Sequence, residues 1–303
     1  MKKNILSFLV GAIIFIALLV FAGKYIGWGK ILSVWKRFTP EQLALVTGLT
    51  ALSYLLRAIR VFDYFYTSVR KRFITVLRLS LLHNCIANLM PMRSGEAAFP
   101  LLMKREFSMP LTNSTTGLLW LRLLDLYSLG LLTAVVFLIE ESAVYGTLLL
   151  VVLISAALFI WFWKQHHAKH TPENPSLFLK TKRFILNNLP ANPLTASRTV
   201  LWSLLSWGVK LFAYAYCVRI FAPVSNWQAY TGVVAAELSS VSPVHGIAGT
   251  GTYEGALTLA LAPFGVDTGV ALTAAINLHI FLLSCSITFA LLALLLPHSK
   301  PST

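Results

Sequence analysis

Several apolar runs of more than 18 residues are the feature that most constrains the fold of this chain. A run of that length crosses the hydrocarbon core of a bilayer as an α-helix, because about 20 residues at 1.5 Å each are needed. The composition agrees, since 57% of the residues are hydrophobic and only 12% are charged, which is far from the usage of soluble proteins. The sequence therefore predicts an all-α polytopic membrane protein with one transmembrane domain, residues 1–303.

Six spanning helices are expected from these runs. The first, Ile5 to Ala22, follows Lys2-Lys3 and so resembles a signal peptide, but its apolar stretch is longer than a typical signal sequence. The polar stretch from Gln165 to Ser197 has the size of one loop and leaves no room for a folded soluble domain. The other five spans are predicted at about 42–66, 111–139, 143–164, 198–222 and 267–296.

Two further apolar segments are too short to cross, and each runs into a small-residue turn that carries a Glu. Leu79 to Met90 has about a dozen residues before Pro91, and Gln228 to Val241 has about fourteen before Pro243. We expect each segment to fold back on itself within the bilayer, with a second half-helix returning to the same side. The fold would then contain two re-entrant helical hairpins.

The distribution of charge favours this topology. With the N- and C-termini in the cytoplasm, the basic loop 165–197 and the cluster Arg70-Lys71-Arg72 lie inside, while Glu140-Glu141 lies outside. This agrees with the positive-inside rule. The loop that contains Lys24 and Lys30 is an exception, because it lies outside in this topology.

The same topology makes the two halves of the chain an inverted repeat. A shift of 157 residues places Phe107 to Arg122 on Phe264 to His279, so that His279 takes the position of Arg122. The order helix, helix, hairpin, helix then occurs in residues 4–139 and again in 143–296. Such repeats usually place a binding site between the halves near the bilayer midplane and suit alternating access.

Charged side chains inside the spans need a reason, because each costs about 2.5 to 3.5 kcal/mol on insertion scales. Arg57 and Arg60 lie one turn apart toward the predicted cytoplasmic side, where snorkelling to headgroups and ligand binding explain them equally well. Arg122 and Asp125 lie one turn apart near the middle of a span. They predict an internal ion pair, with either a structural or a functional role.

The two Glu-bearing turns give the strongest functional signal. Irregular backbone inside a bilayer is tolerated only where protein or a polar cavity satisfies it, and a half-helix N-terminus offers N–H groups to an anion. Glu96 and Glu254 fall in the first turn of their second half-helices, where helix capping alone would also explain them. Lys210 and Glu237 add charge at similar depth. The candidate substrate-binding residues are Arg93, Gly95, Glu96, Arg122, Asp125, His245, Gly246, Gly249, Gly251, Glu254 and His279.

No catalytic or cofactor pattern accompanies these turns. The sequence has no Walker motif, no metal-spaced His/Cys cluster and no G-x-S-x-G, and Cys85, Cys217 and Cys285 form no C-x-x-C pair. The net charge of +14 comes from basic residues that flank apolar runs without an aromatic stacking platform. We therefore expect no enzymatic activity, no cofactor, no metal and no nucleic-acid partner.

Three motifs in the chain together resemble the transmembrane region of lysylphosphatidylglycerol synthase, also called the flippase-like domain. In chain order they are Pro91-x-Arg93-x-Gly95-Glu96, Arg122-x-x-Asp125 and Pro243-x-x-Gly246-x-x-Gly-x-Gly251-x-x-Glu254. The resemblance covers nearly the whole chain. It implies a multi-pass protein of the bacterial inner membrane that translocates lipids. The chain ends near Thr303 without the transferase domain of multidomain relatives, so we do not expect lysyl-lipid synthesis. Ala98 and Phe99 stand where the family often has a basic residue, so the lipid is expected to differ.

Three functions remain open at this point. The first is a lipid flippase or translocase that moves a phospholipid or another lipid-linked headgroup, with Arg93, Arg122 and His279 holding phosphate. The second is a non-catalytic membrane subunit that partners a separate lipid synthase or glycosyltransferase through the 165–197 loop. The third is an intramembrane lipid-modifying enzyme that uses Glu96 or Glu254.

Overall fold

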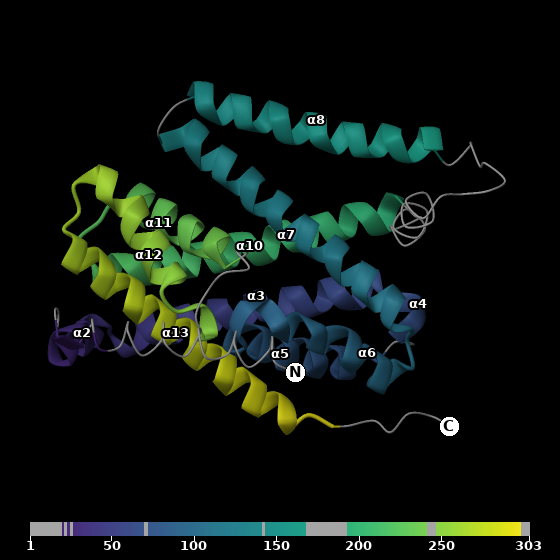
Figure 1. Cartoon of the computed structure of the whole chain (residues 1–303), viewed down its shortest axis with the longest axis horizontal. Helices are drawn as coiled ribbons and strands as arrows, with labels where there is room; N and C mark the ends of the chain where they lie inside the picture. Colours follow the sequence, from purple (N-terminus) through teal and green to yellow (C-terminus); the bar gives the residue numbers. More distant parts are fainter. Residues whose placement is uncertain are drawn as a thin grey trace, which may run out of the picture.

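A computed structural model describes residues 20, 23–24, 27–69, 72–140, 143–167, 193–240 and 247–297 (Figure 1). Several predicted features lie outside this part. They are nearly all of the first span, most of the 165–197 loop, His245, Gly246 and the side chain of Arg93. The described part is helical, which confirms the all-α class. In chain order its helices are α2 (Trp28–Ser33), η2 (Val34–Arg37), α3 (Pro40–Tyr64), α4 (Tyr66–Val69), α5 (Phe73–Leu89), η3 (Pro91–Ala97), α6 (Ala98–Phe107), α7 (Leu111–Glu140), α8 (Ala143–His167), α10 (Pro193–Phe221), α11 (Asn226–Ser239), η4 (Ile247–Gly249), α12 (Thr252–Leu261), η5 (Ala262–Phe264) and α13 (Thr268–Leu294).

Four helices in the described part are long and apolar enough to cross a membrane, namely α3, α7, α10 and α13. They coincide with four of the six predicted spans to within a few residues at each end. A fifth predicted span forms the 25-residue helix α8, whose described segment Ala143–Ser155 is apolar. The chain is therefore a polytopic membrane protein.

Polar caps decide where two of these helices begin. The hydroxyl of Thr39 accepts the backbone N–H of Gln42, and the Gln42 side chain accepts the N–H of Thr39. Ser225 and Gln228 form the same reciprocal pair at the start of α11. Each pair satisfies N–H groups that a helix leaves without a partner at its first turn.

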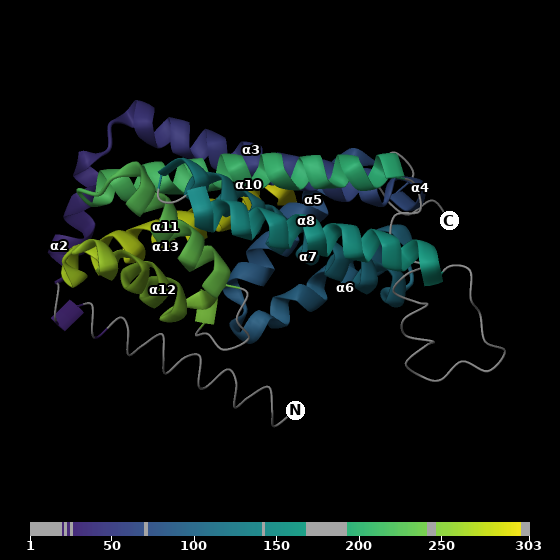
Figure 2. The same ribbon diagram turned by 90° about the horizontal axis from the view of Figure 1, so that it is seen from above.

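Both short apolar segments form helical hairpins. Helix α5 begins at Phe73 instead of Leu79, because the charge on Arg78 interrupts the apolar run but not the helix. It leads through η3 into α6, and α11 leads through η4 toward α12. The α5–α6 hairpin extends from the end of the molecule where α4 lies, and the α11–α12 hairpin extends from the opposite end (Figures 1 and 2). Their turns η3 and η4 contact each other at the centre.

The helix contacts of the first half recur in the second. Between the halves, α3 packs along α10 and α5 packs along α13. Helix α5 packs on α3 and α6 on α7, just as α11 packs on α10 and α12 on α13. The contacts within each half therefore follow the same plan.

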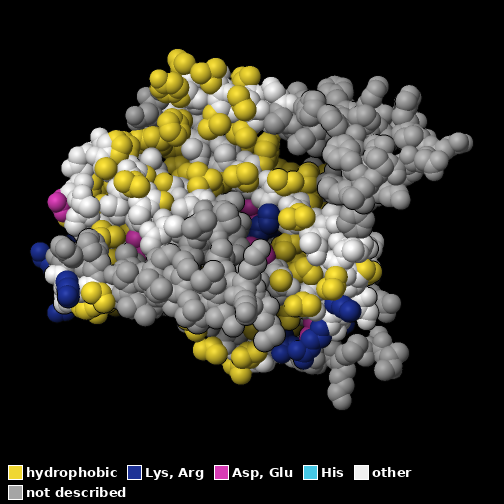
Figure 3. Space-filling model, viewed as in Figure 1, with side chains coloured by type: hydrophobic (Ala, Val, Ile, Leu, Met, Phe, Trp, Pro, Cys, Tyr) yellow, Lys and Arg dark blue, Asp and Glu magenta, His cyan; other side chains and the backbone are white. Residues whose placement is uncertain are grey.

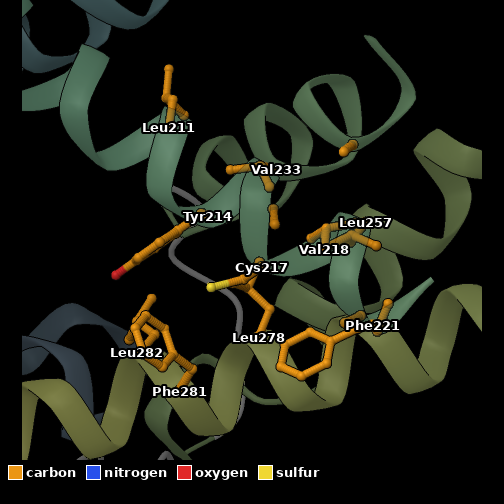
Figure 4. Packing of buried hydrophobic residues seen from close by; sticks show 14 of the residues in the cluster. Leu211, Tyr214, Cys217, Val218, Phe221, Val233, Leu257, Leu278, Phe281 and Leu282 are labelled. Carbon is orange, nitrogen blue, oxygen red and sulfur yellow. The ribbon is translucent and has the colours of Figure 1, made fainter. Parts of the chain in front are cut away.

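The buried apolar side chains divide into two main clusters. One cluster lies between α3, α5, α6 and α7, with Val61, Leu79 and Met103 among its members. The other is centred on α10 to α13, where Tyr214 and Leu278 are fully buried, and Figure 4 shows its side chains packed between these helices. The second cluster also includes Val34, Val46 and Leu129 of the first half, so apolar packing as well as polar groups joins the two halves.

Candidate functional site

A cavity of about 630 Å³ lies between the two halves. Helices α3, α5 and α7 and the turn η3 line it from the first half, and α10, α11, α12, α13 and η4 line it from the second. Figure 3 shows Lys/Arg and Asp/Glu side chains among hydrophobic ones near the place where α7 crosses the middle of the view. The charged and imidazole side chains in the cavity wall are Arg57, Glu96, Arg122, Asp125, Lys210, Glu237 and His279.

Asp125, near the middle of α7, is the acceptor of a buried network. Arg60 donates from Nη1 to Oδ1 at 2.5 Å and from Nη2 to Oδ2 at 3.4 Å. Trp207 Nε1 donates to Oδ1 at 2.8 Å, and Arg122 Nη1 donates to Oδ2 at 3.2 Å. The predicted internal pair of Arg122 and Asp125 is therefore confirmed. The snorkelling interpretation of Arg60 is wrong, because this residue is only 4% exposed and its guanidinium pairs with Asp125.

Glu96 joins the first hairpin to the same network. Its Oε1 lies 2.7 Å from Arg122 Nη2, and its Oε2 lies 3.3 Å from His83 Nε2. Glu96 belongs to the 3₁₀ turn η3 and precedes α6, so it does not occupy the first turn of that helix as predicted. Arg122 consequently bridges the carboxylates of Glu96 and Asp125.

Glu254 and His279 form the corresponding pair of the second half. Nδ1 of His279 lies 2.6 Å from Glu254 Oε1, and Nε2 lies 2.8 Å from the carbonyl oxygen of Ala248. The other oxygen of Glu254 accepts the N–H of Gly251 at 2.8 Å, so the predicted capping role is confirmed. The Tyr253 ring lies against the imidazole, with 4.7 Å between ring centroids. This pair therefore holds the second turn against α13.

A third ion pair lies across the cavity, between α10 and α11. Lys210 Nζ contacts Glu237 Oε2 at 2.6 Å, and both side chains are buried. Lys210 Nζ also lies 4.9 Å from the centroid of the Trp207 ring, a distance at which a cation is attracted to the ring face. The second oxygen of Glu237 is shielded and has no hydrogen-bond partner among the described residues.

Arg57 differs from the other cations of the cavity. Its guanidinium carbon lies 4.9 Å from the centroid of the Trp207 ring. Nε and Nη2 are shielded from solvent, and neither has a hydrogen-bond partner in the described part of the chain. No carboxylate there pairs with Arg57 within ion-pair distance. Arg57 is thus a cation in the cavity wall whose hydrogen-bonding capacity is largely unused.

Glycines shape the two turns for different reasons. A Cβ at Gly95 would overlap the carbonyl oxygen of Ile86 and lie 2.7 Å from the Cα of Ala87, so only glycine lets η3 pack this closely on α5. In the second turn Gly249 and Gly251 have φ angles of 81° and 92°. These are values that residues with a side chain adopt only at a cost.

Three leucines of α7 form an apolar lip at the cavity. Leu119, Leu123 and Leu126 line the cavity, yet their side chains are 59%, 58% and 48% exposed. They lie at i, i+4 and i+7 and so share one face of the helix. The polar interior of the cavity is therefore continuous with an apolar outer surface of α7.

The structure brings most of the predicted site residues together. Glu96, Arg122, Asp125, Gly249 and His279 all line the cavity, and Glu254 contacts His279 from behind the wall. Gly95 and Gly251 shape the turns. Arg93, His245 and Gly246 stay predictions, because the side chain of the first and all of the other two lie outside the described residues.

Further cavity residues were absent from the predicted set. Charge inside an apolar segment singled out Arg57, Lys210 and Glu237, but their partners are distant in sequence and could not be assigned. Trp207 and Asn84 gave no signal, since neither residue type is unusual in such a helix. The described residues contain no group of three or more His, Cys, Asp or Glu that could hold a metal ion. The site is suited to binding a polar or charged group.

Comparison with known families identifies one match. The model of the lysylphosphatidylglycerol synthase TM region matches residues 5–290 of the chain. A search of curated proteins finds no match.

Proposed function

We propose that this chain, which belongs to the family of the lysylphosphatidylglycerol synthase TM region, translocates a phospholipid or another lipid-linked headgroup across the bacterial inner membrane. In this proposal it moves the lipid without changing its covalent structure. The membrane lipid is its partner, and no cofactor takes part. The proposal does not require lysyl-lipid synthesis, because movement of a lipid needs only a path for its headgroup.

The observation that carries the proposal is the cavity with its apolar lip. A lipid needs a polar environment for its headgroup and an apolar path for its acyl chains at the same time. The cavity supplies the first with its ion pairs, and Leu119, Leu123 and Leu126 supply the second at its opening. Charged groups this deep in a membrane protein usually mark a substrate pathway.

The recurrence of the same helix contacts in the two halves supports a transport mechanism. Two similar halves can rock against each other around a fixed site, which is the motion of alternating access. The recurring helix contacts and the hairpins that extend from opposite ends support an inverted repeat with two re-entrant hairpins. In this proposal residues 4–139 and 143–296 are the two repeats, and contacts between them, such as the hydrogen bond from Trp207 to Asp125, open and close as the cavity changes side.

Reconstituted vesicles test translocation. Fluorescent phospholipids with several headgroups and a labelled polyprenyl phosphate are placed in the inner leaflet, and their arrival outside is followed by quenching with a membrane-impermeant reductant. We expect the wild-type chain to accelerate movement of at least one lipid class over protein-free vesicles. Movement of none of these classes would overturn the proposal.

Two variants test whether the lipid path runs through the cavity. Arg122→Gln removes the bridge between Glu96 and Asp125 and should slow lipid movement, whereas Arg219→Gln changes an exposed arginine outside the cavity and should not. Both proteins must retain the same elution profile in detergent. Equal slowing by the two variants would show that the cavity is not the path.

Single cysteines test the topology. In a background without Cys85, Cys217 and Cys285, a cysteine at Asn174 should react with an impermeant reagent only from the cytoplasmic side. Cysteines at Ser142 and Asn226 should react only from outside. Labelling of the cysteine at position 174 from outside would exclude the inverted repeat and the cytoplasmic termini.

A further inference from the structure

We propose that Arg57 and the Trp207 ring form the binding site for the phosphate of an anionic lipid, whose acyl chain leaves the cavity over the leucine lip of α7. The inference rests on the proposed function, because it names the substrate class of the same cavity. It assigns the phosphate to Arg57, which the sequence did not distinguish from Arg60.

The cavity wall has a surplus of hydrogen-bond donors. Nε and Nη2 of Arg57, Nε of Arg122 and Nε1 of Trp120 are shielded and have no partner among the described residues. On the acceptor side, Oε1 of Glu237 is likewise without a partner. Burying a hydrogen-bond donor without an acceptor costs free energy. Several such donors in one cavity therefore favour the binding of an anion that supplies acceptor oxygens. A phosphate offers several such oxygens and suits the fork of a guanidinium.

Asp125 has no lone pair left to accept a hydrogen bond from Arg57. A carboxylate has about four lone-pair positions, and Asp125 already accepts two hydrogen bonds from Arg60, one from Arg122 and one from Trp207. The nearest acid of α7 is therefore saturated by other donors. Arg57 remains beside it with its charge uncompensated by a hydrogen-bonded partner.

The charges bonded to one another in the cavity wall do not balance. Arg57, Arg122 and Lys210 line the cavity and Arg60 lies directly behind it, while the carboxylates bonded to this group are Glu96, Asp125 and Glu237. Glu254 pairs with His279 instead and is not bonded to this group. Cations thus exceed carboxylates by one, at Arg57. An anionic headgroup completes the cavity, whereas a zwitterionic headgroup leaves the positive charge uncompensated.

The surroundings of Arg57 place the rest of the lipid. Arg57 and Lys210 each lie 4.9 Å from the centroid of the Trp207 ring, so the indole is near both the unpaired cation and the Lys210–Glu237 pair. Leu119, Leu123 and Leu126 line the same cavity from α7 and are exposed on the outer surface. A phosphate at Arg57 therefore has an apolar exit for its chains within the same cavity.

Binding to the purified full-length chain in detergent tests the inference. The probes are dioctanoyl phosphatidic acid, dioctanoylglycerol, dioctanoyl phosphatidylcholine and inorganic phosphate, and the readouts are native mass spectrometry and the ligand-induced shift in melting temperature. The first two probes differ only in the phosphate. We expect phosphatidic acid to bind at least about 10-fold more tightly than each of the other three, since one charge-assisted hydrogen-bonded pair has about that effect.

Substitution of Arg57 identifies the residue that binds. Arg57→Gln should weaken phosphatidic acid binding about 10-fold to 100-fold and leave dioctanoylglycerol binding unchanged. Arg57→Lys should give an intermediate affinity, because Lys keeps the charge and loses the planar fork. Arg219→Gln, at an exposed arginine outside the cavity, should bind as the wild type does.

Stability without ligand separates binding from a structural role. Because the charge of Arg57 has no hydrogen-bonded partner, the ligand-free Arg57→Gln protein should melt at the wild-type temperature or above it. A lower melting temperature for both Arg57→Gln and Arg57→Lys would overturn the inference in favour of a structural residue.

Three other outcomes would also overturn it. Wild-type affinity of Arg57→Gln for phosphatidic acid would exclude Arg57 as the site. Equal affinity of the wild type for inorganic phosphate would show a free-anion site instead of a lipid site, and equal affinity for phosphatidylcholine would refute the charge argument.

The binding assay does not depend on transport. Loss of phosphatidic acid binding in Arg57→Gln, together with wild-type vesicles that move no lipid, would keep the site and reject translocation. Lipid movement by the wild type together with unchanged binding by Arg57→Gln would reject only the present inference.

Discussion

The two Glu-bearing turns occupy matching places in the two halves but hold their carboxylates differently. Glu96 of the first turn pairs with Arg122, and Glu254 of the second pairs with His279, which takes the position of Arg122 when the chain is shifted by 157 residues. The contact distances are 2.7 and 2.6 Å. The repeat therefore preserves the pair of positions and changes the chemistry of the cation.

The partners behind each pair differ as well. Arg122 also reaches Asp125, whereas Leu282 stands at the matching position of the second half. Glu254 instead caps its own helix, and His279 uses its second nitrogen on a backbone carbonyl. The Glu96–Arg122 pair thus belongs to a network of charges spread over several helices. The Glu254–His279 pair instead holds a single turn against α13.

The largest effect should follow from breaking the network of the first half. Asp125→Asn leaves Arg60 buried without a compensating charge, and we expect the free energy of unfolding to fall by about 3–5 kcal/mol. Denaturation in mixed detergent micelles measures it. Asp267→Asn is the matched control, because Asp267 only caps α13 and Asn caps equally well. A loss below about 1 kcal/mol for Asp125→Asn would contradict the network.

The next comparison replaces the carboxylate of each turn. Glu254→Gln weakens both the bond to His279 and the cap on Gly251, and should cost about 1.5–3 kcal/mol of unfolding free energy. Glu96→Gln should cost about 1 kcal/mol, because Arg122 keeps Asp125. The same denaturation assay compares the two variants. Equal losses would mean that the turns are energetically equivalent and that the contrast between the halves does not hold.

Substitutions of the turn glycines separate close packing from backbone conformation. Gly95→Ala should cost about 1–3 kcal/mol through overlap with α5, and Gly249→Ala about 1–2 kcal/mol through its left-handed conformation. Asn tolerates that conformation, so Gly249→Asn should recover part of the loss, whereas Gly95→Asn should recover none. Melting temperatures of the four proteins test this pattern. Recovery at position 95 would refute the packing explanation.

The smallest effects are expected at the helix caps. Thr39→Ala and Ser225→Ala each remove one side-chain acceptor at a helix start and should cost about 1 kcal/mol of unfolding free energy. Neither residue lines the cavity, so lipid movement in vesicles should stay at the wild-type rate. A selective loss of transport in either variant would place function at the helix ends instead of between the halves.

Much of this architecture could be predicted from hydrophobic run lengths. The runs predicted at about 42–66, 111–139 and 267–296 are long enough to span the bilayer, whereas the runs before Pro91 and Pro243 are too short to do so. The start of α5 was missed, because a charge such as Arg78 ends a hydropathy run without ending a helix. The pair of Arg122 and Asp125 was predictable because both residues lie one turn apart on the same helix.

The ion pairs between helices were not predictable in this way. Arg57 and Arg60 have the same sequence environment, yet Arg60 forms an ion pair with Asp125 and Arg57 lies over the ring of Trp207. Lys210 finds Glu237 on the next helix. Which of two neighbouring arginines pairs with an acid depends on the rotation of α3 against α7 and α10, and local pattern carries no information about that rotation.

The sequence by itself determined that the chain is a helical membrane protein and where its helices turn, because burial in lipid leaves a long apolar run few conformations and glycine or proline marks the breaks. Only the tertiary structure decided which charges are satisfied. A hydrogen bond requires a donor and an acceptor within about 3 Å of each other, and for Arg57, Arg60 and Asp125 that distance is set by the packing of helices far apart in the chain.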